Sequence, residues 1–388
     1  MTTPRAYLDH NATTPIAPEV FEAMVPFLTE QYGNPSSAYD FGKSAGAAVA
    51  RAREQLASLL NCEPRELLFT SCGTESDNAA ILSALRTTGK KHLVTTQVEH
   101  SAVHKLCEDL ETRGYRVTWL PVAEDGTLDP SQVDEAIHDD TAVVSVMWAN
   151  NETGVLFPVE EIAALCRTRG VLFHTDAVQT VGKLPIDLSG GQGPDFLALS
   201  GHKLHAPKGI GALYIRSGVR FVPFQIGGGQ ERERRGGTEN VPYIVGLGRA
   251  AELSAENLLE EETRTRALRD KLEAALLRVP GAARNGHATL RLPNTASLRF
   301  EGVEAEAALL ALNKRGICAS AGSACTTGNL APSHVLTAMG LSAADARGTL
   351  RFSLSHMTTD AEIDYALGAI PEAIAEVRSH LPATLQPK

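Results

Sequence analysis

Thr141-Ala-Val-Val-Ser-Val-Met147 is followed by a helical pattern from Val159 to Thr168 and then by Val171-Leu-Phe-His174. Short apolar runs rich in β-branched residues predict buried strands, and the amphipathic segment between them predicts a covering helix. Two strands joined through a helix are parallel, because a parallel connection needs a crossover. This stretch therefore predicts an α/β fold.

The same alternation continues on both sides of this unit, from about residue 64 to residue 215. Further strands are predicted at Leu67-Leu-Phe-Thr70, His92-Leu-Val-Thr95, Arg116-Val-Thr-Trp-Leu120, Asp195-Phe-Leu-Ala-Leu199 and Gly211-Ala-Leu-Tyr-Ile215. The pattern predicts a large domain with a mostly parallel sheet between helices. Beyond Gly246 comes a long charged helical pattern, about 247–277, and then shorter strands. We predict a smaller α+β domain there.

Composition excludes several classes of protein. The 388 residues are 43% hydrophobic and 21% charged, the net charge is -10, and the densest basic cluster is only Arg232, Arg234 and Arg235. We therefore expect neither a nucleic-acid partner nor a membrane partner, and a cytoplasmic location. Six cysteines lack zinc-site spacing, so we expect reduced thiols and no metal.

Lys203 lies between the two last strands of the alternation, in the turn Ser200-Gly-His-Lys203. Burial at a strand end lowers the pKa of a lysine, and a neutral amine is a nucleophile toward an aldehyde. The alternative is a solvated turn lysine like Lys208. This stretch alone leaves both interpretations open.

Polar residues also follow other predicted strands. Gly73 and Thr74 begin a helix whose unpaired N–H groups would attract a phosphate, although an ordinary capped helix is the alternative. Asp176 follows a buried strand, where a carboxylate must be paired or protonated. His100 and Asn151 end two more strands, and a satisfied loop histidine and a turn former are the alternatives.

Pyridoxal phosphate is one small molecule that would use all these groups together. Its phosphate suits Gly73 and Thr74, and its aldehyde suits Lys203. The other predicted pairings are Asp176 with the pyridine nitrogen, Gln179 or Asn151 with the phenolic oxygen, and His100 with the face of the ring. With this cofactor, the reactive interpretation of Lys203 is favoured.

A segment rich in small residues, from Arg315 to Asn329, contains Cys325. Such a segment has no core of its own, so we expect a mobile loop. A thiol is a nucleophile only as the thiolate, and the sequence does not show a lowered pKa for Cys325. The alternative is a small residue in a flexible loop.

Taken together, these motifs resemble the cysteine desulfurases of the NifS and IscS type, most of all the nitrogenase-associated NifS branch. The matching stretches are Tyr7-Leu-Asp, Asn11-Ala-Thr-Thr14, Tyr32-Gly-Asn-Pro-Ser-Ser37, Gly73-Thr-Glu-Ser-Asp-Asn78, Glu99-His100, Asn150-Asn-Glu-Thr-Gly154, Asp176-Ala-Val-Gln179, Ser200-Gly-His-Lys203, Arg235 through Asn240 and Gly322-Ser-Ala-Cys325. The resemblance implies conversion of L-cysteine to L-alanine with a persulfide on Cys325. It further implies sulfur supply to an iron–sulfur scaffold or another acceptor protein, for nitrogen fixation.

The resemblance also implies a fold-type I aminotransferase architecture. The large cofactor-binding domain would span residues 14–256. The small domain would combine residues 1–13 and 257–388, with the cysteine loop at about 318–330. A homodimer is implied, because the threonine that matches Thr238 reaches the phosphate of the other subunit.

Other site residues follow from the same resemblance. Ser200 and His202 would lie beside the phosphate, and Arg351 would hold the substrate carboxylate with Asn34 nearby. Lys203, His100 and Cys325 would be the catalytic residues.

The chain departs from the family pattern at His10, Tyr39 and Gly236. We assign no catalytic role to the first two, and we expect Gly236 to loosen the loop that carries Thr238. The alternatives to a desulfurase are a selenocysteine lyase or aminotransferase of the same fold, and a non-catalytic assembly scaffold.

Overall fold

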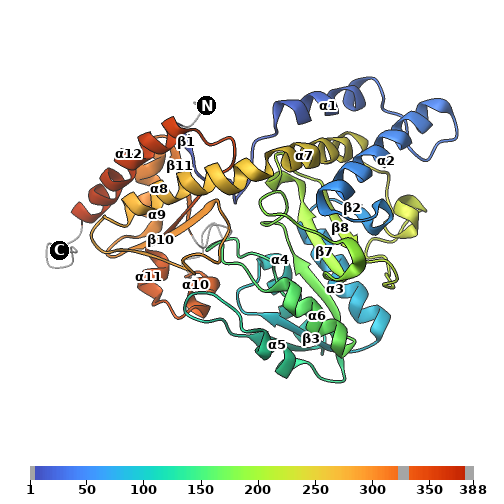
Figure 1. The fold of residues 1–388 in the computed structure, drawn as a ribbon, viewed down its shortest axis with the longest axis horizontal. Helices are drawn as coiled ribbons and strands as arrows, with labels where there is room; N and C mark the ends of the chain where they lie inside the picture. The colour runs from blue at the N-terminus through green and yellow to red at the C-terminus, as the bar shows by residue number, and fades with distance from the viewer. Residues whose placement is uncertain (1–4, 322–331, 381–388) are drawn as a thin grey trace.

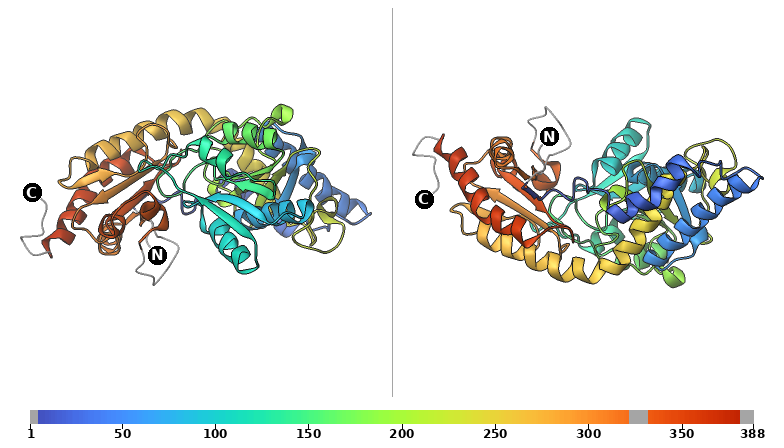
Figure 2. Two further views of the ribbon diagram at one scale, coloured as in Figure 1. Left: turned by 90° about the horizontal axis from the view of Figure 1, so that it is seen from below. Right: turned by 90° about the horizontal axis from the view of Figure 1, so that it is seen from above.

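The structure, a computed structural model, describes residues 5–321 and 332–380. A larger and a smaller part lie side by side and are joined by a long helical stretch that runs along one edge of both (Figures 1 and 2). Among the helices of the described ranges, none is long and apolar enough to cross a membrane.

The larger part is built on a seven-stranded sheet with the order β2-β8-β7-β6-β5-β3-β4. Its strands are β2 Leu67–Thr70, β3 His92–Thr96, β4 Arg116–Leu120, β5 Thr141–Ser145, β6 Leu172–Asp176, β7 Phe196–Ser200 and β8 Gly211–Ile215. Only β8 runs antiparallel to its neighbours. The predicted, mostly parallel sheet is confirmed.

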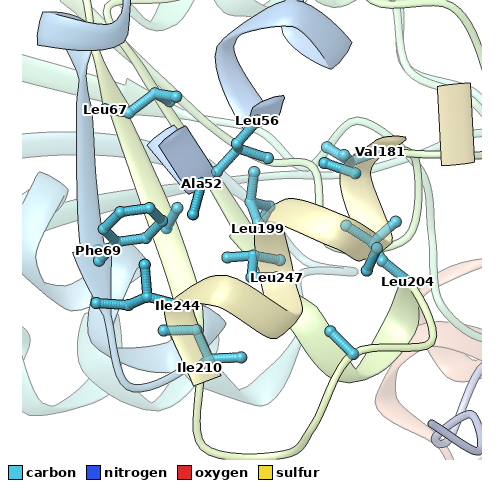
Figure 3. Close-up of a cluster of buried hydrophobic side chains, with 14 of the residues drawn as sticks. Ala52, Leu56, Leu67, Phe69, Val181, Leu199, Leu204, Ile210, Ile244 and Leu247 are labelled. Carbon is cyan, nitrogen blue, oxygen red and sulfur yellow. The ribbon is translucent and has the colours of Figure 1, made fainter. Parts of the chain in front are cut away.

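Helices cover both faces of this sheet. They are α1 Pro18–Thr29, α2 Asp40–Leu60, α3 Gly73–Thr88, α4 Ser101–Thr112, α5 Pro130–Ala136, α6 Val159–Arg169 and α7 Val241–Glu260. On one face, α2 and α7 pack over β2 and β7, where Leu56, Phe69, Leu199 and Leu247 are buried together (Figure 3). On the other face, α3 and α4 cover the central strands. This core fixes the strand ends that carry the predicted site.

The helical stretch between the two parts begins earlier than predicted. It consists of α7, a π turn over Glu261–Thr265 and α8 Arg266–Leu276, which follow one another directly. Asn240 caps its start by accepting a hydrogen bond from the Tyr243 N–H, and a proline in the first turn costs no helical hydrogen bond.

The smaller part has a four-stranded antiparallel sheet with the order β12-β13-β10-β9. After α8, the elements of the smaller part are, in chain order, β9 Ala282–Arg284, β10 Thr295–Phe300, α9 Ala305–Lys314, β11 Ile317–Cys318, β12 Ser320–Ala321, α10 His334–Ala338, α11 Ala343–Arg347, β13 Thr349–Ser353 and α12 Asp360–Ser379. The first strand of the chain, β1 Ala6–Tyr7, pairs in parallel with β11. The amino-terminal segment therefore packs with the smaller part before it crosses to the larger one.

Candidate active site

Lys203 lies in a turn of 3₁₀ helix, Gly201–Lys203, directly after β7. Its side chain is half-buried, and Nζ donates hydrogen bonds to the carbonyl oxygens of Ala12, at 2.7 Å, and of Asn11. Both acceptors belong to the amino-terminal segment. Lys203 is thus held at the carboxyl end of the sheet by backbone from a distant part of the sequence.

Asp176 ends the neighbouring strand, β6, and is buried. Its Oδ1 accepts a hydrogen bond of 2.9 Å from the Val178 N–H. Burial raises the pKa of this carboxyl, while His100, the Val178 N–H and Lys203 act in the opposite direction. Gln179, in the same loop, donates from Nε2 to the Asn11 carbonyl oxygen at 3.1 Å. Asp176 is therefore a buried acid that a cationic ring nitrogen would stabilise as the carboxylate.

His100 and Asn151 follow β3 and β5. His100 caps α4, and its Nδ1 accepts a hydrogen bond of 3.2 Å from the Ala102 N–H, so the proton of the neutral ring is on Nε2. Burial lowers the pKa of His100, and the nearby Asp176 acts in the opposite direction. Asn151 contacts the site through its backbone oxygen, which accepts a hydrogen bond of 2.8 Å from Arg351 Nη1.

The first turn of α3 lies close to the loop after Asp176. The residue before the helix, Cys72, has no side-chain cap, so the N–H groups at Gly73 and Thr74 remain available to an anion. A Cβ on Gly73 would lie 2.7 Å from Val178 Cγ2, so this close approach needs glycine. The start of α3 therefore faces the same region as Asp176, the carboxylate predicted to pair with the ring nitrogen.

Arg351 comes from the smaller part, in β13, and is buried. Besides the Asn151 oxygen, it binds Asp9, whose Oδ1 lies 3.0 Å from Nη2. Asn11 Nδ2 also donates to the Asn151 oxygen, at 3.3 Å. One chain of hydrogen bonds thus runs from Lys203 through Asn11 and Asn151 to Arg351.

Ser200 is buried at the end of β7 beside Gly73, where an added Cβ would lie 3.5 Å from Ser200 Cβ. His202 is half-buried, with Nδ1 3.2 Å from Thr13 Oγ. Not every predicted site residue lies in this group. Thr238 and Asn34 are exposed, and the Asn34 side chain accepts a bond from the Ser36 N–H rather than approaching Arg351. The connection between α1 and α2, which carries Asn34, lies at the far edge of the molecule (Figure 1). Cys325 lies outside the described residues.

The three departures from the family pattern have separate structural contexts. His10 is buried against the ring of Tyr7, and burial, then His356, lowers its pKa to about 3. Tyr39 is exposed at the start of α2. Gly236 lies in close contact with other backbone, because a Cβ there would lie 2.5 Å from the Gly227 Cα. This glycine permits close backbone packing, and its effect on the mobility of the loop stays a prediction.

Sequence reasoning missed several residues of the site. Asp9 and Asn11 received no role, although their motif was part of the resemblance. Glu99 and Glu152 also received no role, and both are buried. Burial raises the pKa of Glu99 to about 8 and that of Glu152 to about 7. One signal in the sequence could have identified such residues, namely a charged residue directly beside a predicted site residue, such as Glu99 next to His100.

The residues present fit pyridoxal phosphate. Two buried amide oxygens, Asn151 Oδ1 and Gln179 Oε1, have no hydrogen-bond partner among the described residues. Buried polar atoms are normally paired, so amides at these positions are suited to a polar ligand such as the phenolic oxygen. The uncapped start of α3 suits the phosphate, and Asp176 and Lys203 suit the ring nitrogen and the aldehyde.

A family model described as aminotransferase class-V matches residues 6–366. The chain belongs to this family. Among class-V aminotransferases, it is 54% identical over 381 residues to a cysteine desulfurase of Trichormus azollae, covering 97% of this chain and 94% of that protein. It is also 54% identical over 379 residues to the cysteine desulfurase NifS of Azotobacter vinelandii, with the same coverage.

Solved structures agree with this family membership. A NifS-like protein superposes with a TM-score of 0.90 at 38% identity, covering 96% of this chain and all of that one (100%). A NifS-like protein from Rickettsia africae gives a TM-score of 0.87 at 33% identity, covering 96% and 99%. The predicted fold type, pyridoxal phosphate cofactor and enzyme class, a cysteine desulfurase, are confirmed.

Proposed function

We propose that the protein converts L-cysteine to L-alanine and transfers the sulfur to Cys325 as a persulfide, for use in iron–sulfur cluster assembly. The observation that carries this proposal is the hydrogen-bond chain from Lys203 through Asn11 and Asn151 to Arg351. This chain of hydrogen bonds connects the Lys203 amine with the buried Arg351 guanidinium. An α-amino acid substrate needs the amine at its Cα and the guanidinium at its carboxylate.

Each side chain has a defined task in this reaction. Pyridoxal phosphate, when bound, supplies a sink for the electrons of the broken Cα–H bond. Lys203 removes the α proton, and Asp176 provides the negative charge that keeps the ring nitrogen protonated. Arg351 holds the substrate carboxylate. His100 carries its proton on Nε2 and exchanges it with the substrate thiol.

Cys325 is the proposed sulfur acceptor. Its thiolate attacks the substrate sulfur, so that an S–S bond forms and the C–S bond breaks. The electron pair goes to the carbon, which takes a proton and leaves in alanine; cysteine and one thiol thus give alanine and one persulfide. Four of the five described cysteines are weaker candidates, because burial raises the pKa of Cys62 and of Cys166 to about 12, and raises those of Cys107 and Cys318.

A homodimer completes the proposal. Thr238 is exposed, so it is accessible to the phosphate site of a second copy of the chain. Large apolar side chains on the same part are also exposed, namely Phe21 at 55%, Tyr32 at 75% and Ile226 at 86%. A second copy would cover such a surface. We place the enzyme in the cytoplasm, with an iron–sulfur scaffold as acceptor and nitrogenase clusters as the destination.

The test is purification of the enzyme with its visible spectrum, followed by addition of L-cysteine while alanine and protein persulfide are measured. The proposal expects equal amounts of both in the first turnover. Cys325→Ala should keep the cofactor spectrum but lose persulfide and sulfide release, whereas Cys72→Ala and Cys318→Ala should keep all three. Undiminished release by Cys325→Ala, or a keto acid as the product, would contradict it.

A further inference from the structure

A buried row of three polar side chains lies beneath the site and has no task in the proposed reaction. Ser145 Oγ lies 2.9 Å from His174 Nδ1, and His174 Nε2 lies 3.3 Å from Asp77 Oδ1. The three residues are at most 1% exposed. A substrate cannot reach them, so the row is not a catalytic triad despite its residue types.

The row joins three elements that carry the cofactor site. Ser145 ends β5, His174 lies in β6, and Asp77 lies in α3, one turn beyond the phosphate-facing Gly73. Because side chains alternate along a strand, His174 and Asp176 project from the same face of β6. The contact between Asp77 and His174 therefore connects α3, whose start is the predicted phosphate position, with β6, which ends at Asp176.

The facing atoms of this contact require a proton between them. His174 Nε2 and Asp77 Oδ1 lie 3.3 Å apart, and neither has a hydrogen-bond partner among the described residues. Two bare acceptors at this distance would repel each other. Burial, and then Asp176, raises the pKa of Asp77 well above its usual value, and burial lowers the pKa of His174 to about 3. The raised pKa of Asp77 favours the proton on its carboxyl, and the neutral His174 then donates from Nδ1 to Ser145.

We propose that Asp77 and His174 are positioning residues that act as an uncharged pair and set the spacing between the start of α3 and Asp176. An uncharged Asp77 leaves Asp176 as the carboxylate that pairs with the ring nitrogen. The inference rests on the proposed function only in that pyridoxal phosphate occupies this site. It assigns the pair no contact with the substrate.

The test compares Asp77→Asn and Asp77→Ala, with Ser83→Ala as the control. Ser83 is on the same helix and equally buried, and its Oγ accepts a bond from the Val222 N–H, away from the row. The dissociation constant of pyridoxal phosphate is measured by titrating cofactor-free protein and following absorbance. The thermal midpoint of the cofactor-free protein is measured in parallel.

We expect Asp77→Ala to weaken cofactor binding about tenfold, the effect of leaving a buried partner unpaired. Asp77→Asn should bind within about twofold of the wild type, because its amide donates to His174 Nε2 without charge, and Ser83→Ala should do the same. Equal weakening by Asp77→Asn would show that the carboxylate charge matters. Wild-type affinity in Asp77→Ala would show that the pair does not position the cofactor. Either result overturns the proposal.

A second measurement needs no weakened variant. Nitrogen NMR of the histidine rings in the wild-type holoenzyme should show His174 as the neutral tautomer with the proton on Nδ1, assigned by comparison with His174→Gln. A doubly protonated ring, or a neutral ring with its proton on Nε2, would overturn the uncharged pair. None of these measurements uses cysteine. A failed desulfurase assay would therefore leave the binding comparison intact, and equal affinities in all variants would leave the desulfurase function intact.

Discussion

Asp9 Oδ1 lies 3.0 Å from Arg351 Nη2, so a carboxylate of the amino-terminal segment orients the guanidinium that we assign to the substrate. Arg351 Nη1 is bound to the Asn151 oxygen, and Nε is buried without a partner among the described residues. The side chain is therefore fixed before the substrate arrives. This relationship gives Asp9 a testable role.

We predict that Asp9→Ala raises the KM for cysteine about tenfold and changes kcat less, because Arg351 loses its orientation but keeps its charge. Steady-state kinetics on the holoenzyme would measure both constants. Asp40→Ala, which removes an exposed carboxylate whose one ion pair among the described residues is with Lys43, is the control and should leave KM unchanged. A wild-type KM in Asp9→Ala would contradict the assigned role.

A second lysine near Lys203, Lys183, is buried. Lys183 donates to the Gln179 carbonyl oxygen at 3.0 Å, and burial lowers its pKa to about 8. We predict that borohydride reduction of the holoenzyme attaches the cofactor to Lys203, as located by peptide mass spectrometry. Lys203→Ala should abolish the label and Lys208→Ala should retain it. A label on Lys183 would disprove the assignment.

Glu152 makes the stability of the protein depend on pH. Its folded pKa, about 7, lies above the ordinary value of 4.5, so the native state binds more protons between these values. Stability therefore falls as pH rises from about 4.5 to 7 and then levels off. We predict that Glu152→Gln is more stable than the wild type at pH 8, by about 3 kcal/mol at most, and equally stable near pH 4.5.

Denaturant unfolding of both proteins at the two pH values would measure this difference. The glutamine keeps an acceptor for Ser333 Oγ, which lies 2.6 Å from Glu152 Oε2, so the comparison isolates the charge. Glu54→Gln, at an exposed position of α2, is the control. An advantage of Glu152→Gln that is the same at both pH values would refute the prediction.

The glycine loop before Thr238 provides a prediction on packing. A Cβ on Gly236 would lie 2.5 Å from the Gly227 Cα, whereas a Cβ on Gly229 would meet nothing within 4 Å. We predict that Gly236→Ala destabilises the protein by about 1–3 kcal/mol, as overpacking does, and that Gly229→Ala does not. Thermal midpoints of the two variants would check this. Similar midpoints would mean that the loop relaxes.

The fold followed from local sequence to a large extent. The buried strands are short apolar runs with clear ends, and the alternation with helices leaves little choice of sheet type. Lys203 and Asp176 were found because a polar residue directly after such a run lies at the sheet edge. The start of α7 at Val241 was missed because Pro242 and Gly246 are usually helix breakers, although proline is tolerated in the first turn.

The rest of the site depends on contacts between distant residues. Nothing near Asp9 indicates that it pairs with Arg351, 342 positions away. The carbonyl groups that bind Lys203 leave no trace in side-chain patterns, since every residue has one. Glu99 and Glu152 look like surface residues because charged side chains are rarely buried.

The pairing of β1 with β11 has a consequence for how the enzyme is made. Asn11 and Ala12, which bind Lys203, are anchored through Ala6 to Ile317 and through His10 to Ser353. Ribosomes deliver these anchors long after Asn11 and Ala12, at about 5–20 residues per second. The nascent chain can therefore form the large sheet first, but the backbone that binds Lys203 is anchored only once β11 and β13 have emerged. Capture of the cofactor in its final geometry thus waits for the smaller part.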